Sequence, residues 1–151
     1  MDKMYRNTLS KLSICGVIFV LLSIGICGCI SPYQNIIIDD SLYQSAPRDP
    51  LTINDIRLNK NHLEFNISYG GGCEEHEFQL YSTSFMESYP VQVNILLSHE
   101  DNDDPCDMWI TETLIFNIFP LKESWQKSYN NNSGIIIMNI QGWSESINYE
   151  F

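Results

Sequence analysis

Over roughly the last hundred residues of the chain, apolar and polar residues alternate with a period of two. The clearest example is the segment 62–69, in which every second residue is apolar and polar residues lie between them. Such alternation is typical of β-strands with one buried face. Residues that favour turns separate the alternating segments. The predicted strands cover 51–58, 62–69, 76–83, 91–98, 113–118, 135–140 and 144–151.

Seven short strands without a long helix favour one all-β domain over residues 51–151. We expect an antiparallel β-sandwich of immunoglobulin-like kind, and a partly open β-barrel is the alternative. The segment 121–129, which follows Pro120, is predicted as a short helical crossover. No tryptophan lies midway between Cys73 and Cys106, so the pattern is not that of an antibody domain.

The first thirty residues read as an export signal. A basic leader precedes an uncharged apolar run that starts at Leu12. The run ends in Ile26-Cys27-Gly28-Cys29, which resembles the lipobox of prokaryotic membrane lipoproteins, although Cys27 departs from the usual small or hydroxyl residue. The resemblance implies a signal peptide over 1–28, lipid attachment to Cys29, and anchoring at the extracytoplasmic face of the cell membrane.

An uncleaved membrane anchor over 12–30 is the alternative, and it also exports the body of the chain. In either case residues 29–50, which mix prolines and aspartates around the triplet 36–38, are predicted to form a tether. The triplet itself is a candidate edge strand. If the chain is cleaved before Cys29, two acyl chains hold it at the membrane stably, as a single chain does not.

Charge narrows the range of partners. From Cys29 onward the chain has five basic and eighteen acidic residues, a formal charge of −13. Such a surface repels phosphates and favours cations or basic partners, so we exclude nucleic acid binding.

The cysteine count predicts one disulfide. Of five cysteines, two lie in the apolar run and Cys29 is the lipidation candidate, which leaves Cys73 and Cys106 as a pair. An oxidising compartment favours a bond between them. A tetrahedral zinc site is the alternative, with Cys73, His76, His99 and Cys106 as ligands.

The acidic segment 100–107 raises the question of calcium, because hard cations take carboxylate oxygens. The candidate ligands are Asp101, Asp103, Asp104 and Asp107. Against an EF-hand template, however, Pro105 and Cys106 occupy positions that require a ligand and a glycine. A solvated hairpin loop is the simpler interpretation. The glycines 70–72 predict a bulge or wide turn with positive φ rather than a phosphate loop, since no Lys-Ser/Thr follows them.

Segments 69–76, 97–107 and 116–121 are similar to secreted prokaryotic proteins of unassigned function. This resemblance implies no activity, but it does imply that Cys73, His76, His99 and Cys106 lie near one another. No Gly-x-Ser-x-Gly elbow or His-Glu-x-x-His helix is present in the sequence. We therefore expect a lipid-anchored, non-enzymatic envelope protein whose domain binds a protein, a glycan or a cation. A metal-binding extracytoplasmic protein, with zinc or calcium, is the alternative, and a purely structural envelope component is a third possibility.

Overall fold

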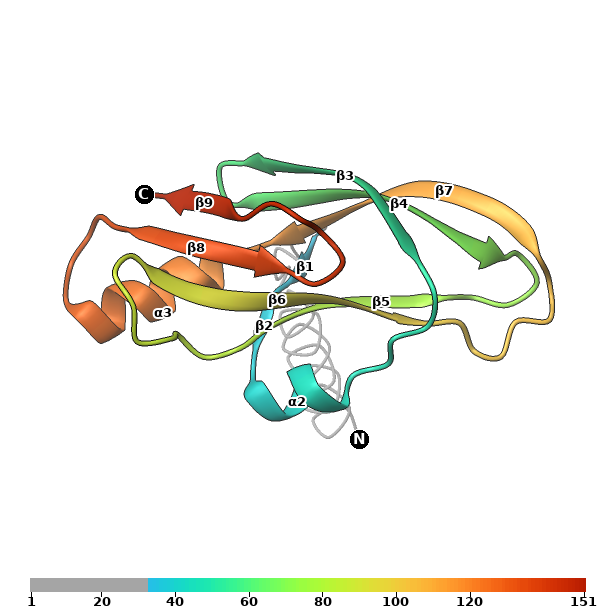
Figure 1. The fold of residues 1–151 in the computed structure, drawn as a ribbon, viewed down its shortest axis with the longest axis horizontal. Coiled ribbons are helices and arrows are strands. Elements are labelled where there is room, and N and C mark those ends of the chain that lie inside the picture. The colour runs from blue at the N-terminus through green and yellow to red at the C-terminus, as the bar shows by residue number, and fades with distance from the viewer. Residues whose placement is uncertain (1–32) are drawn as a thin grey trace, which may run out of the picture. The chain divides into compact units, whose positions relative to one another are not determined.

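The computed structural model describes residues 33–151, whose strands form two β-sheets with a shared core (Figure 1). Sheet A has the strand order β1, β7, β4, β3, and sheet B has the order β2, β5, β6, β8, β9. The strands are β1 (Gln34–Asn35), β2 (Ile37–Ile38), β3 (Thr52–Asn59), β4 (His62–Gly71), β5 (Glu77–Ser82), β6 (Val91–Glu100), β7 (Met108–Asn117), β8 (Ile135–Ile140) and β9 (Ile147–Glu150). The helices are α2 (Asp40–Ser45) and α3 (Phe119–Tyr129). The prediction of an all-β, sandwich-like fold is confirmed, because the described strands form two sheets and not a closed barrel.

Alternation along the strands builds the core. On β4, Leu63, Phe65 and Ile67 are fully buried, and on β6 every second residue from Val91 to Leu97 is buried. These positions belong to one cluster of apolar residues contributed by both sheets. Each large apolar side chain removed from water stabilises the fold by about 1.5–3 kcal/mol. The apolar residues whose period of two predicted the strands therefore also hold the two sheets together.

The sheets are mixed, whereas the sequence predicted antiparallel pairing. Four strand pairs are antiparallel, but β1–β7, β2–β5 and β6–β8 are parallel. The β6–β8 pairing is parallel because β7 returns along the molecule in the other sheet, so that β8 starts at the end where β6 started (Figure 1). Helix α3 makes this crossover, as predicted for 121–129, and Asn130 ends it in the left-handed conformation.

The described part of the predicted tether, residues 33–50, belongs to the domain, which corrects that prediction. Strand β1 pairs with β7 in sheet A, and β2 pairs with β5 in sheet B, so this segment passes from one sheet to the other. Between them Ile36 is 3% exposed and donates its N–H to the carbonyl of Asn117. The residues around the apolar triplet favour turns, but the segment joins the sheets because burial stabilises two of the three triplet residues.

The signal peptide over 1–28, the lipidation site at Cys29 and the start of the tether lie outside the described residues. Within residues 33–151, neither helix has the length and apolar character of a membrane span.

Replacing Ile36 tests whether this segment is part of the fold. We expect Ile36→Ala to lower the free energy of unfolding by about 2–5 kcal/mol, because it leaves a cavity between the sheets. Ile37→Ala is the matched control, since Ile37 is exposed on a two-residue edge strand. Urea unfolding followed by tryptophan fluorescence measures both. Equal stabilities for the two variants would contradict the assignment.

Candidate functional site

Two loops meet at one end of the sandwich. One loop, 72–76, leads from β4 to β5, and the other, 101–107, leads from β6 to β7. They meet because β4 ends opposite the start of β7, and β5 starts opposite the end of β6. The predicted disulfide joins them, with the Cα atoms of Cys73 and Cys106 5.8 Å apart. Closing a loop of this length stabilises the fold by about 3–4 kcal/mol in the chain-entropy model. We call the two loops, together with Met108 and Trp109, the disulfide end.

Glycines allow the first loop to approach its surroundings closely. A Cβ on Gly71 would lie 2.4 Å from Nε2 of His76, and one on Gly72 would lie 2.6 Å from the side chain of Met108. Both residues have positive φ, of +154° and +115°. The prediction of a turn with positive φ at the glycine run is confirmed.

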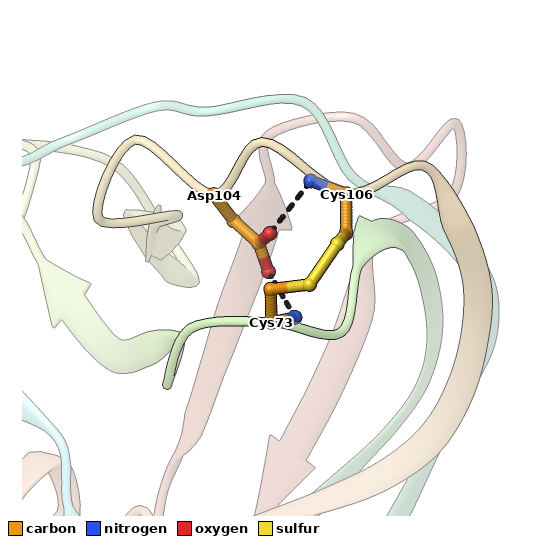
Figure 2. Close-up of side chains that lie close together, drawn as sticks. All are labelled: Cys73, Asp104 and Cys106. Carbon is orange, nitrogen blue, oxygen red and sulfur yellow. Dashed lines mark hydrogen bonds between the residues drawn. A yellow bond between two sulfur atoms is a disulfide. The ribbon is translucent and has the colours of Figure 1, made fainter.

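The carboxylate of Asp104 organises both loops. Its Oδ2 accepts backbone N–H groups from Gly72, Cys73 and Glu74 at 2.7, 2.9 and 3.0 Å. Its Oδ1 accepts the N–H of Cys106 at 2.8 Å. Figure 2 shows this carboxylate between the two loops, beside the disulfide. The N–H of Glu74, followed by those of Cys106 and Cys73, holds the pKa of Asp104 well below its usual range and outweighs the opposing effect of desolvation.

Two buried histidines extend this network. Nε2 of His76 lies 3.1 Å from Oδ2 of Asp104, and its Nδ1 lies 2.8 Å from Nε2 of His99. Nδ1 of His99 lies 3.2 Å from the carbonyl oxygen of Asp49. The carbonyl of Asp49 and the carboxylate of Asp104 can only accept hydrogen bonds, so Nδ1 of His99 and Nε2 of His76 are the donors to them. The two rings thus join Asp104 to the backbone at Asp49 in one chain of hydrogen bonds.

Aromatic rings pack against the histidine pair. The ring of His99 stacks on Phe78 with centroids 4.7 Å apart, and Tyr69 lies 4.7 Å from His76 and 5.2 Å from His99. The hydroxyl of Tyr69 donates to Glu112 at 2.7 Å. Burial, with a smaller effect from Glu112, raises the pKa of Tyr69 to about 12. The tyrosine therefore stays a neutral donor.

The structure brings the four predicted zinc ligands to one place but uses them differently. Cys73 and Cys106 are bonded to each other, and a disulfide sulfur is not a thiolate ligand. Each of the four ring nitrogens of the two histidines already takes part in a hydrogen bond. The side chain that lies with the two sulfur atoms is Asp104, not His99. In its disulfide form the protein therefore does not present the predicted zinc site.

The predicted calcium ligands do not converge. Asp104 faces backbone N–H groups, and Oδ1 of Asp101 accepts the N–H of Asp103 within the loop. Asp103 and Asp107 are exposed. Within residues 33–151, the one set of three or more ligand-type side chains that come together is Cys73, Asp104 and Cys106. The acidic segment is therefore a loop, with one aspartate used to fix its shape.

The disulfide end carries two exposed apolar side chains. Trp109 is 68% exposed and Met108 is 61% exposed, at the start of β7. Trp109 faces away from the core, opposite Gly70, which has no side chain to cover it. The in-and-out alternation of β7, extended toward the loop, predicts that Trp109 lies on the outward face of the strand with Thr111.

The sequence of the two loops and of β7 contains carboxylates and no lysine or arginine. No lysine or arginine lies between Lys60 and Lys122 in the sequence. A cavity of about 680 Å³ opens beside His76 and has three carboxylates in its lining, those of Glu75, Glu77 and Glu100. A basic or cationic group is the chemical complement of this surface.

Comparisons with known proteins bear on the fold. No protein-family model and no curated protein sequence matches the chain. A NigD-like immunity protein from Bacteroides caccae is similar in structure, with a TM-score of 0.57 and 16% identity over 77% of this chain and 58% of that one. A protein of unknown function (DUF1344) from Bacteroides vulgatus gives 0.48 at 14% identity over 80% of this chain and 56% of that one. A toxin-related protein from Parabacteroides distasonis gives 0.45 at 15% identity over 79% and 61%. The chain thus spans less than two thirds of each of these structures.

Removing the charge of Asp104 tests the network through its pH dependence. Because the folded-state pKa is depressed, ionised Asp104 stabilises the fold above its unfolded pKa of about 4, and this stabilisation is lost as pH falls toward the folded pKa. We expect Asp104→Asn to lower the melting temperature at pH 7, with a difference from wild type that narrows between about pH 5 and pH 2.

Asp103→Asn is the matched control, since it removes a neighbouring charge in an exposed, left-handed position that suits asparagine. Thermal unfolding at several pH values distinguishes the two. If the curves for Asp104→Asn and wild type run parallel from pH 7 to pH 2, the carboxylate does not have the role assigned to it.

Proposed function

We propose that the chain is a lipid-anchored protein of the extracytoplasmic membrane face, and that it acts by binding a basic protein partner rather than by catalysis. The observation that carries the proposal is the exposed tryptophan of the disulfide end, Trp109, beside two loops that contain carboxylates and no lysine or arginine. Tryptophan is enriched among the residues that dominate binding energy at protein interfaces.

The state of the chemical groups supports binding over catalysis. Asp104 accepts hydrogen bonds from four backbone N–H groups. The two histidine rings are hydrogen-bonded to each other, to Asp104 and to a backbone carbonyl. The two sulfurs at this end are oxidised. A general base or nucleophile must be free to reach a substrate, whereas these groups hold two loops in place. The disulfide end is thus suited to present a fixed surface.

Two features support the proposed location. The residues Ile26-Cys27-Gly28-Cys29 resemble a lipobox, and the Cys73–Cys106 disulfide suits an oxidising compartment. The partner is then another component of the envelope or of its surroundings. One structural neighbour is named as an immunity protein, a role compatible with binding.

Replacing Trp109 tests the binding surface. Envelope extract is passed over the immobilised full-length protein, and captured proteins are identified by mass spectrometry and titrated for affinity. We expect a basic protein whose affinity falls by about tenfold or more with Trp109→Ala and decreases with added salt. Tyr89→Ala, which removes a fully exposed aromatic outside the disulfide end, is the control and should leave the affinity unchanged. Capture of an acidic protein, or equal affinity for Trp109→Ala, would refute the proposal.

Replacing Cys29 tests the anchor separately. We expect Cys29→Ala to abolish incorporation of a labelled fatty acid and to leave the precursor uncut, because the modified sulfur is missing. Cys27→Ala is the matched control, and it should keep the label. Metabolic labelling followed by gel electrophoresis of membrane and soluble fractions gives the answer. Labelling that persists in Cys29→Ala would exclude this cysteine as the lipidation site.

A further inference from the structure

A second cavity lies at the other end of the sandwich. It is about 760 Å³ in volume and is formed where β6 and β8 begin and β9 ends, next to α3. Strand β6 runs from this cavity at Val91 to the disulfide end at Glu100, which separates the two by about 30 Å. Figure 1 shows α3 and the carboxyl terminus at the end opposite the loops of the disulfide end. The cavity is therefore independent of the surface proposed to bind a protein.

Aromatic rings line this cavity. Trp125 and Tyr129 come from α3, with ring centroids 5.1 Å apart, and Phe151 meets Trp125 edge-on at 5.4 Å. Tyr89 lines the cavity from the loop before β6 and is fully exposed, and Tyr129 is about half exposed. Flat apolar faces are thus held at the rim of a concave site, where a ligand can stack on them.

One lining residue has an unused hydrogen-bond donor. Nε1 of Trp125 is buried and has no hydrogen-bond partner, and it is the one buried side-chain polar atom of this kind within residues 33–151. The indole ring packs closely against Gly134, the residue before β8. A Cβ at this position would lie 2.4 Å from two ring carbons. A buried N–H without a partner destabilises the fold, and a ligand with an acceptor would recover that loss.

The other lining groups restrict the ligand class. Hydroxyl, amide and carboxylate groups are contributed by Ser88, Asn131, Ser133 and Glu150, and no lysine, arginine or histidine lines the cavity. An anionic ligand would be repelled by the carboxylate of Glu150, and no cationic side chain lines the cavity to offset this repulsion. One face of the Phe151 ring already carries a cation, because Nζ of Lys122 lies 5.2 Å from the ring centroid. A wholly apolar ligand would desolvate the polar groups without replacing their hydrogen bonds.

A neutral molecule with apolar faces and a polar edge satisfies all of these conditions. We propose that this aromatic cavity binds a neutral saccharide, with a pyranose ring stacked on Tyr129 or Tyr89, its hydroxyls bonded to the polar rim, and one oxygen accepting the indole N–H of Trp125. The assignment does not depend on the proposed protein partner.

The test uses the full-length protein in lipid nanodiscs, which avoids detergents with sugar headgroups. The probes are neutral oligosaccharides of glucose, mannose, xylose and N-acetylglucosamine, each added at millimolar concentration. We expect at least one to bind in calorimetry, and to shift the indole N–H resonance of Trp125 but not those of Trp109 and Trp143. At least one of the variants Tyr129→Ala and Tyr89→Ala should weaken binding by about tenfold.

Trp109→Ala is the matched control, because it removes an exposed aromatic at the disulfide end and should leave saccharide affinity unchanged. The same variant is expected to lose the protein partner, so the two proposals fail separately. Several results would overturn the saccharide proposal: no probe binds, both tyrosine variants bind with the wild-type affinity, or the Trp125 resonance responds to toluene and to no saccharide.

Discussion

The disulfide end depends on the Asp104 carboxylate, because this one group connects both loops and, through His76, the histidine pair. The disulfide fixes a single point between the loops. The carboxylate instead fixes the backbone of three consecutive residues in one loop and of Cys106 in the other, so it determines their orientation as well as their distance. A negative charge suits this position because four backbone N–H groups donate to the carboxylate and Nε2 of His76 lies beside it. The shape of the surface around Trp109 follows from that arrangement.

The alternation of apolar and polar residues predicted the strands well wherever one face is buried. It failed where an inward-facing polar residue or pairing with a distant strand determines the structure. Strand β7 begins five residues before the predicted 113, since Glu112 faces inward and breaks the apolar pattern, a position made possible by the hydroxyl of Tyr69. Strands β1 and β2 have two residues each, too few to show a period. Their pairing depends on β7 and β5, which are distant in sequence, and so does the parallel register of β8 on β6. Local patterns do not contain these relationships.

The site was predictable in its members but not in its chemistry. His99 occupies the inward position that follows Leu97 on β6, so the alternation, extended by two residues, places it in the core. The pairing of Cys73 with Cys106 follows from counting cysteines. Asp104, however, bonds to backbone N–H groups about thirty positions earlier, and such contacts have no sequence signature because every residue except proline offers the same donor. The acidic segment therefore resembled a calcium loop, while the structure uses its central aspartate to hold the adjoining loop.

Charge and exposure together define what the disulfide end can bind. An exposed tryptophan on a strand would ordinarily favour association between copies of the same chain. Here every copy carries the same net negative charge, −11 for the full sequence, and like charges brought together oppose self-association. A partner of opposite charge meets no such barrier and gains from electrostatic attraction before contact. The apolar side chain then supplies binding energy and the acidic surroundings supply selectivity, which is why the basic character of the partner, and not only its presence, is the informative property to measure.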